Sequence, residues 1–232
     1  MSQIKILDKF YKVKPHWFWK QYSQEAWEPE TLEIYKKYIN PETTYIDLGA
    51  WLGVTLMYAH ALGCTKLYGV EANPESFELL QEHCIMNGIE AHLDNICICN
   101  ENKLVDFGAD INYTSTSSAS SMRGTQFRVQ GIKAEEYFKQ FNNIKGLFIK
   151  IDIEGAEEII LDDLINFLKY NKALVYLSIH IPFLQSKESF FDRLLELPII
   201  NEDYKKCLEK RTKVSELRED NFFEILIDNR RE

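Results

Sequence analysis

The fold is decided by the stretch Thr44-Tyr45-Ile46-Asp47-Leu48-Gly49-Ala50-Trp51-Leu52-Gly53. An apolar run of β-favouring residues ends in an acid, two glycines follow, and an apolar segment of helical length comes next. This pattern predicts a strand, a tight turn and a helix. Gly49 would let a ligand approach the backbone closely, and the N–H groups that open the helix would point into the same crevice. The turn therefore predicts a nucleoside-bearing ligand, although glycines at such turns also serve purely steric needs.

The spacing of the two glycines excludes one class of nucleoside ligand. Dinucleotide-binding turns have the spacing G-x-G-x-x-G, whereas this stretch has D-x-G-x-x-x-G. The ligand predicted from the residues is therefore not NAD, and an NAD-dependent reductase is not expected.

A second acid follows at the end of the next predicted strand. Glu71 closes the run 66–71, about twenty residues beyond the turn, where a carboxylate can accept both hydroxyls of a ribose. Asn73 and Pro74 then open a predicted helix that ends before Gly88. The turn and the acid thus predict the same nucleoside, and an exposed strand-end acid is the plainer alternative.

Length and charge limit the functions that the chain can have. The 232 residues suit one domain with a substantial core, and the net charge of −9 argues against a nucleic acid as partner. We expect a small-molecule or sugar-nucleotide acceptor, and no apolar stretch predicts a signal peptide or a membrane span. Five cysteines without a CxxC pair predict buried, reduced thiols and a cytoplasmic protein: Cys64, Cys84, Cys97, Cys99 and Cys207.

The remaining pattern predicts an α/β architecture with an extension. Residues 1–40, rich in aromatic side chains, are predicted to form an N-terminal helical cap that only packs or also covers the ligand, and residues 41–232 form the main domain. Strands are expected at 91–99, 147–151 and 173–179, a hairpin-like insertion at 103–132, and two closing strands at 204–208 and 222–227. Alternating strands and helices with this ending predict a doubly wound, seven-stranded, Rossmann-like sheet.

A second informative stretch is Lys150-Ile151-Asp152-Ile153-Glu154-Gly155-Ala156-Glu157. Acids on alternate residues at a strand end are costly for structure alone. His180 closes the next strand, so it should reach the same edge of the sheet as Asp152. We predict His180 as general base, since its ordinary pKa near 6.5 suits proton uptake, with Asp152 as the orienting group or the base itself. A core histidine bonded to a loop carbonyl is the plainer alternative for His180.

Both stretches, together with Gly69-Val-Glu-Ala-Asn-Pro74, resemble the FkbM family of S-adenosylmethionine-dependent methyltransferases. The resemblance runs from Tyr45 to Asp228 and is sharpest at 150–157. It implies a class I methyltransferase fold and O-methylation, often of sugars in surface polysaccharides, glycolipids or natural products. Many relatives have Asn where this chain has Trp51.

The resemblance also implies roles for single residues. Asp47, Gly49, Ala50 and Gly53 would frame the methionine half of S-adenosylmethionine, Glu71 would hold the ribose, and Asn95 with Ile96 would border adenine. The full set of expected cofactor contacts is Asp47, Gly49, Ala50, Trp51, Gly53, Glu71, Asn73, Asn95, Ile96 and Asp152. The expected catalytic residues are His180, Asp152 and Glu154, of which Glu154 either faces away or joins the other two around Mg²⁺ or Ca²⁺. No metal ligand is assigned, and a divalent metal stays open.

The expected function is therefore methylation of a hydroxyl on a sugar or sugar nucleotide, for a surface or capsular polysaccharide or a related glycoconjugate. Another small molecule, such as a phosphorylated compound or natural product, is an alternative acceptor. Methylation of RNA or protein is disfavoured by the acidic charge and by Asp-Ile-Glu-Gly at 152–155, where an amide-methylating motif would stand. A non-catalytic, cofactor-binding scaffold is the alternative outside enzymes, and a homodimer stays open.

Overall fold

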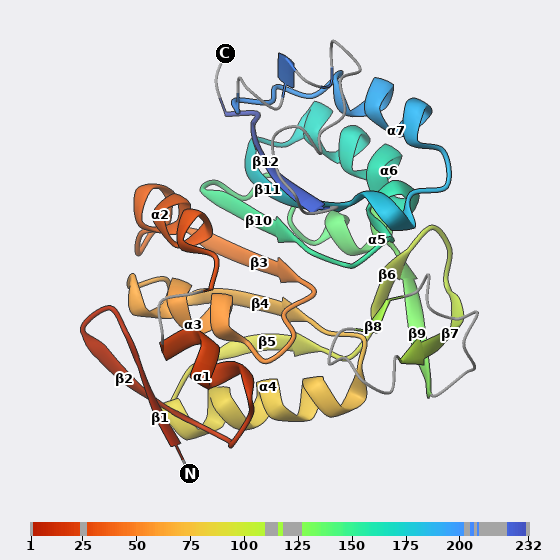
Figure 1. Ribbon diagram of the computed structural model, residues 1–232. Coiled ribbons are helices and arrows are strands. Elements are labelled where there is room, and N and C mark those ends of the chain that lie inside the picture. Colours follow the sequence, from red (N-terminus) through yellow and green to blue (C-terminus); the bar gives the residue numbers. More distant parts are fainter. Residues whose placement is uncertain are drawn as a thin grey trace. The chain divides into compact units, whose positions relative to one another are not determined.

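The computed structural model describes residues 2–23, 27–109, 116–117, 127–201, 205–206, 208 and 222–230. It divides into two units, Met1–Asn95 and Ile96–Glu232, each with strands and helices of its own (Figure 1). The N-terminal 40 residues therefore belong to the same unit as the predicted cofactor turn.

The described residues of the first unit form nine elements in chain order. They are β1 (Ser2–Ile6), β2 (Lys9–Val13), α1 (Phe18–Ser23), α2 (Pro29–Tyr38), β3 (Thr44–Leu48), α3 (Val54–Ala61), β4 (Lys66–Val70), α4 (Pro74–Asn87) and β5 (Ala91–Asp94). Strands β3, β4 and β5 pair in parallel, with Asp47 opposite Gly69 and Leu48 opposite Val70. The turn after β3 and the acid after β4 consequently emerge at the same edge of the sheet, as the sequence predicts.

The expectation of a purely helical cap over residues 1–40 is wrong. Strands β1 and β2 pair as an antiparallel hairpin before the helices α1 and α2 begin. The physical reason lies in the side chains: Ile4, Ile6, Tyr11 and Val13 are buried and alternate with exposed residues, which is the period of a strand.

Helix α4 has the ends that its sequence predicts. The Asn73 side chain accepts hydrogen bonds from the N–H groups of Glu75 and Ser76, at 2.9 and 3.2 Å. Gly88 ends the helix with φ 63°, a left-handed conformation that glycine adopts readily.

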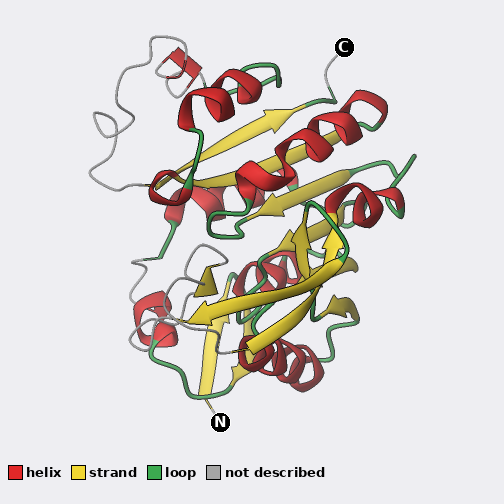
Figure 2. Ribbon diagram, turned by 90° about the vertical axis from the view of Figure 1, so that its right-hand side faces the viewer, coloured by secondary structure: helices red, strands yellow, loops and turns green. Residues whose placement is uncertain are grey.

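The second unit contains the remaining elements. They are β6 (Cys97–Cys99), β7 (Lys103–Ala109), β8 (Thr116–Ser117), β9 (Phe127–Lys133), α5 (Ala134–Lys139), β10 (Leu147–Ile151), α6 (Glu157–Tyr170), β11 (Ala173–His180), a 3-10 turn (Ile181–Phe183), α7 (Lys187–Leu194) and β12 (Phe222–Asp228). Figure 2 distinguishes the helices and strands by colour. Strand β11 pairs in parallel with β10 and antiparallel with β12, so this sheet is mixed.

The insertion predicted at 103–132 is confirmed as strands. Strand β9 pairs antiparallel with β7 and parallel with β6. Most of the polar stretch 113–124 within it lies outside the described residues, which include only 116–117 there.

Of the two predicted closing strands, one is confirmed and one is wrong. Residues 222–228 form β12, whereas the described residues at 205, 206 and 208 are helical. Two adjacent lysines, Lys205 and Lys206, break the alternation of a strand and favour a helix. Beside β12 there is instead a short bridge between Ile199 and Ile227. The α/β, Rossmann-like class is as expected, with a mixed sheet and helices, while the expected count of seven strands is not reproduced in the described segments.

Four of the five cysteines behave as predicted: Cys64, Cys84, Cys97 and Cys99 are buried, free thiols, and Cys207 lies outside the described residues. Among the helices that the structure describes, none is long and apolar enough to cross a membrane.

Candidate functional site

The turn after β3 is an unusual piece of backbone. Gly49, Trp51 and Gly53 have φ values of 86°, 47° and 80°, so every second residue is left-handed. This conformation is natural for glycine but costs about 1 kcal/mol or more for tryptophan. The N–H groups of Gly49 and Ala50 both donate to the carbonyl of Val70, each at 2.9 Å. The turn is thereby fixed to the end of β4, and strain at Trp51 is of the kind that concentrates at functional sites.

Gly53 is also required by packing. A Cβ at this position would lie 2.5 Å from a methyl carbon of Leu80 on α4. A side chain here would therefore have to displace the Leu80 methyl group, in a backbone whose φ of 80° already disfavours residues other than glycine.

Asp47 supports the turn from below. Its carboxylate is fully buried, and one oxygen accepts hydrogen bonds from the Tyr45 hydroxyl at 3.0 Å and from the Thr55 hydroxyl at 2.5 Å. Because Tyr45 donates to Asp47, the Tyr35 hydroxyl must donate to Tyr45, at 2.6 Å. Burial, together with the charge of Asp47, raises the pKa of Tyr45 well above its usual value. Asp47 thus links β3 to the first turn of α3.

Glu71 connects the turn at 49–53 with the loop that follows β4. One carboxylate oxygen accepts the N–H of Trp51 and the other the N–H of Asn73, both at 2.8 Å. The residue is 7% exposed. A carboxylate has about four acceptor positions, so this one can bind backbone groups and ligand hydroxyls together.

Asn95 holds the loop that carries Glu71. Its side-chain N–H₂ group donates to the carbonyls of Glu71 and Ala72, at 2.8 and 3.1 Å. Ile96, which begins the second unit, is partly exposed. The structure therefore brings together the turn, Glu71, Asn73 and Asn95 within the first unit.

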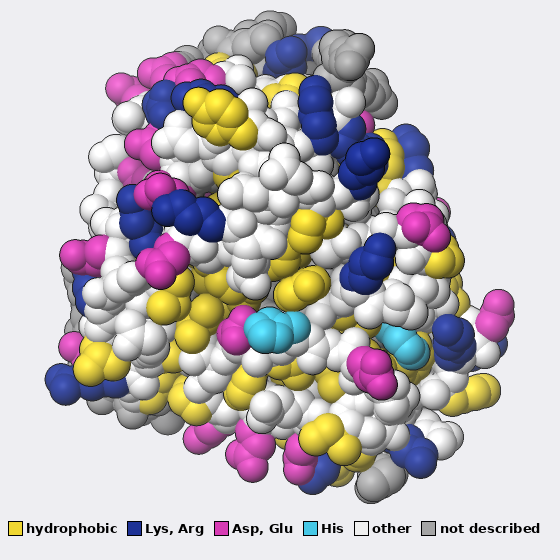
Figure 3. Space-filling view, turned by 180° about the vertical axis from the view of Figure 1, so that it is seen from behind, with side chains coloured by type: hydrophobic (Ala, Val, Ile, Leu, Met, Phe, Trp, Pro, Cys, Tyr) yellow, Lys and Arg dark blue, Asp and Glu magenta, His cyan; other side chains and the backbone are white. Residues whose placement is uncertain are grey.

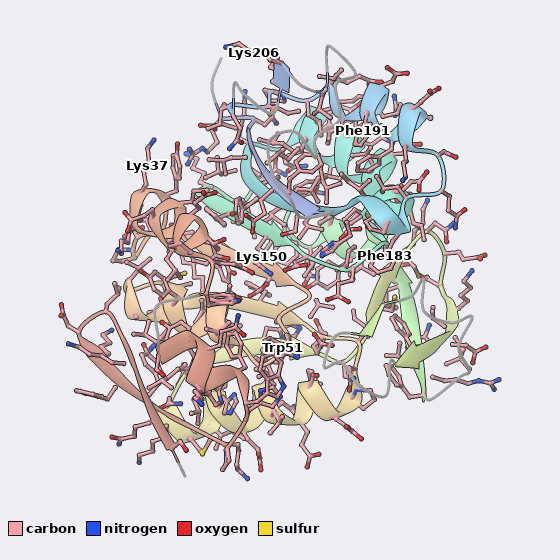
Figure 4. All side chains as sticks on the ribbon, in the orientation of Figure 1. Lys37, Trp51, Lys150, Phe183, Phe191 and Lys206 are labelled. Carbon is pink, nitrogen blue, oxygen red and sulfur yellow. The ribbon has the colours of Figure 1, made fainter. Side chains whose placement is uncertain are left out.

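A second group of polar side chains lies within the second unit, after two adjacent strands. Asp152 directly follows β10, His180 ends β11, and these strands pair in parallel. The Nε2 atom of the His180 imidazole lies 3.7 Å from one carboxylate oxygen of Asp152. The other oxygen of Asp152 lies 3.0 Å from the ammonium of Lys150. The sequence predicts the meeting of Asp152 and His180, and the structure brings them together. Figure 4 labels Lys150 on β10 and Phe183 in the turn after His180.

Glu157 completes this second group. Its fully buried side chain lies 3.0 Å from His180 Nδ1 through one oxygen. The same carboxylate accepts the N–H groups of Ile153 and Gly155, at 3.3 and 2.7 Å. Because the carboxylate can only accept, Nδ1 donates this hydrogen bond. The partner of Nδ1 is therefore Glu157, and the alternative prediction of a bond from His180 to a loop carbonyl is wrong for this nitrogen. Glu157 fixes both the ring and the loop 153–155.

The charge of His180 differs from the expectation. Burial lowers its pKa, but the hydrogen bond to Glu157 and the charges of Asp152, Glu157 and Glu154 outweigh burial and raise the pKa to about 9. Burial likewise opposes ionisation of Asp152, yet Lys150 and His180 hold its pKa below the usual value. At neutral pH the imidazole is therefore protonated between two carboxylates.

Glu154 stands at a strained position of the same loop. Its φ is 46°, and Gly155 follows with φ 106°. Its charge acts on His180 from there. Among the described residues, no group of three or more His, Cys, Asp or Glu side chains is arranged to hold a metal ion. The cation nearest to Asp152 is instead the Lys150 ammonium.

Sequence reasoning assigned no role to Glu157, Lys150 or Thr55. Glu157 and Lys150 stand within the stretch 150–157, and both are buried. The sequence signal that could have found them is a charged residue within or beside an apolar run, since such residues are seldom buried without a partner. Thr55 carries no such signal, because its partner Asp47 becomes evident only when α3 packs on β3.

Comparison with protein families finds a match to the methyltransferase FkbM domain over residues 43–205. A comparison with curated proteins finds no match.

Several solved structures are similar to this chain at low sequence identity. The methyltransferase FkbM of Methylobacillus flagellatus KT has 12% identity and a TM-score of 0.46, with 85% of this chain and 50% of that chain covered. The ribosomal protein L11 methylase of Lactobacillus delbrueckii subsp. bulgaricus has 14% identity and a TM-score of 0.45, covering 88% and 79%. A tRNA (uracil-54, C5)-methyltransferase of Pyrococcus abyssi, in complex with S-adenosyl-L-homocysteine, has 12% identity and a TM-score of 0.45. The match covers 84% of this chain and 37% of that chain. This chain thus spans half the length of the FkbM structure.

Proposed function

Because this chain belongs to the methyltransferase FkbM family, we propose that it transfers a methyl group from S-adenosylmethionine to a hydroxyl of a sugar or sugar nucleotide. The product would serve a surface polysaccharide or a related glycoconjugate. The observation that carries the proposal is the Glu71 carboxylate, which two backbone N–H groups hold beside the glycine turn.

The residues of the first unit fit the cofactor. The left-handed turn at 49–53 leaves backbone without a side chain at Gly49, where a bulky ligand can approach closely. Glu71 offers acceptor positions for the two ribose hydroxyls, and Asn95 keeps its loop in place. Asp47 would act indirectly: it would hold the turn and α3 together and would not touch the ligand.

When bound, S-adenosylmethionine supplies an electrophilic methyl group, so the chain has to orient a hydroxyl and accept one proton. His180 is suited to this task through Nε2, because Glu157 engages Nδ1 and thereby fixes the tautomer. Only the neutral imidazole can take a proton, and the raised pKa makes that form scarce at pH 7. Asp152 would orient the ring or the acceptor hydroxyl, and Glu154 would tune the charge of the ring.

The experiment is an acceptor screen with S-adenosylmethionine labelled in its methyl group. Sugar nucleotides, polysaccharide fragments, phosphorylated small molecules, RNA and peptides are each incubated with the protein, and transferred label is counted. Alkali-stable label in the sugar fractions is expected. Label only in RNA or peptide would contradict the acceptor class, and cofactor binding without transfer to any class would favour a scaffold.

A further inference from the structure

The N-terminal segment packs directly on the cofactor turn. The Trp51 ring lies 4.8 Å from Phe18, 5.6 Å from His16 and 6.3 Å from Trp17, measured between ring centres. Figure 4 labels Trp51. All four rings belong to the first unit. The strained residue of the turn is therefore in contact with side chains that precede the family-matched region 43–205.

His83 links the same two segments through hydrogen bonds. It lies on α4 and is fully buried, with Nδ1 2.8 Å from the Leu52 carbonyl and Nε2 3.0 Å from the Lys14 nitrogen. A carbonyl can only accept and a backbone N–H can only donate. The imidazole must therefore be neutral, with its proton on Nδ1. Burial lowers the pKa of His83, which favours this neutral form at neutral pH.

Further contacts hold the Lys14 end of this link. The Trp19 indole N–H donates to the Lys14 carbonyl at 3.0 Å, and the indole packs edge-on against His83 with ring centres 5.4 Å apart. The Lys14 ammonium pairs with Glu82 on α4 at 2.8 Å. The segment is thus fixed on both sides of the His83 contact.

From this geometry we propose that His83 is a positioning residue for S-adenosylmethionine. Its Nδ1–H fixes the Leu52 carbonyl and hence the turn 49–53, while the docked segment 14–19 fixes its tautomer and covers Trp51. The inference rests on the proposed function, because it assumes that the turn binds the cofactor. It adds that residues outside the family-matched region help to shape the binding site.

Two substitutions of similar size distinguish the role of the His83 Nδ1–H donor from that of the rest of the imidazole ring. In His83→Asn the amide nitrogen lies near the former Nδ1 and can still donate to Leu52, whereas in His83→Gln the amide group reaches towards Lys14. Binding of S-adenosylhomocysteine is measured by calorimetry on the full chain. His83→Gln should lose about tenfold in affinity, the effect of one buried hydrogen bond, and His83→Asn, which keeps the bond to Leu52 and loses only the contact with Lys14, should lose less.

The control is Tyr11→Phe, which removes the 2.9 Å hydrogen bond from β2 to His60 in the last turn of α3. It loosens the N-terminal hairpin without touching the turn, so affinity should be unchanged. Equal affinity of wild type and His83→Gln would overturn the inference while leaving the proposed function intact. Equal losses in both His83 variants would also overturn it, since disturbed packing would then be the cause. A wild type that does not bind would overturn the proposed function as well.

Hydrogen exchange on the wild type tests the same link without any folding risk. Coupling between two sites is reciprocal, so added S-adenosylhomocysteine should slow exchange of the Lys14 amide. The Lys12 amide on β2, which donates to the Asn87 side chain at 2.7 Å, is the control outside the segment 14–19. Slowing at Lys14 beyond that at Lys12 supports the inference, and equal behaviour of the two amides overturns it.

Discussion

At the scale of single residues, His180 shows how neighbours change a side chain's chemistry. Its position after β11 follows from the sequence pattern, and so does the approach of Asp152. Its charge does not, because Glu157 reaches Nδ1 only when the start of α6 folds over the loop 153–155. An ordinary pKa was therefore predicted for a residue whose pKa is raised to about 9.

The raised pKa predicts a pH-dependent contribution of His180 to stability. The pKa is about 9 in the folded chain and 6.5 in the unfolded one, so the contribution is complete below pH 6.5 and lost as pH rises through 9. The shift corresponds to roughly 3 kcal/mol. Urea unfolding of wild type and His180→Gln at intervals from pH 6 to 10 measures it. The difference in unfolding free energy should shrink as pH rises; a constant difference would show that the pKa is not raised.

The same pKa predicts the pH profile of methyl transfer. If the neutral imidazole is the base, the rate at saturating cofactor should rise about tenfold per pH unit below pH 9 and then level off. His180→Ala should abolish turnover while S-adenosylhomocysteine still binds. A flat profile between pH 6 and 9, or unchanged turnover in the variant, would transfer the role of base to Asp152.

Other residues of the site were predicted by position but not by contact. Glu71 was expected to face a ribose, and the structure adds that it receives the N–H groups of Trp51 and Asn73. Asn95 was expected beside adenine, and the structure adds that its amide holds the loop 71–72. A strand pattern locates a residue at a sheet edge, but hydrogen bonds to loop backbone depend on φ values that the pattern does not contain.

At the scale of elements, the turn and the start of α3 depend on Gly53. In Gly53→Ala the new methyl group would meet Leu80 at 2.5 Å in a backbone with φ 80°. We expect a loss of about 1–3 kcal/mol in unfolding free energy and weaker binding of S-adenosylhomocysteine. Chemical unfolding and calorimetry on the same samples measure both effects.

Gly88→Ala is the matched control for this substitution. Gly88 also has a positive φ, 63°, but its Cβ would meet nothing within 4 Å. It should lose about 1 kcal/mol of stability and keep its affinity for the ligand. If both variants bound as the wild type does, the turn would have no part in the cofactor site.

The elements were predictable where local signals agreed. Helix α4 has a capping Asn73, Pro74 and a terminal Gly88, and its bounds match the prediction. The hairpin β1–β2 was missed because the helical prediction, which rested on aromatic residues later in the segment, was extended to all of residues 1–40. The strand expected at 204–208 was wrong where it can be described, because the pattern reading did not weigh the local preference of Lys205 and Lys206 for a helix.

At the scale of the whole molecule, charge bears on the kind of acceptor. The net charge is −9, and the face shown in Figure 3 carries both acidic and basic described side chains. A negative net charge offers little attraction to a nucleic-acid backbone. This agrees with the proposed sugar or sugar-nucleotide acceptor.

We propose that Glu71 and the turn hold S-adenosylmethionine, and calorimetry with S-adenosylhomocysteine is the decisive test of this site. Glu71→Gln places an amide where two backbone N–H groups and two ribose hydroxyls need acceptors, whereas Glu75→Gln changes an exposed acid on the adjoining helix. We expect saturable one-site binding by the wild type and by Glu75→Gln, and an affinity at least about tenfold weaker in Glu71→Gln. No binding by the wild type, or equal affinity in Glu71→Gln, would contradict it.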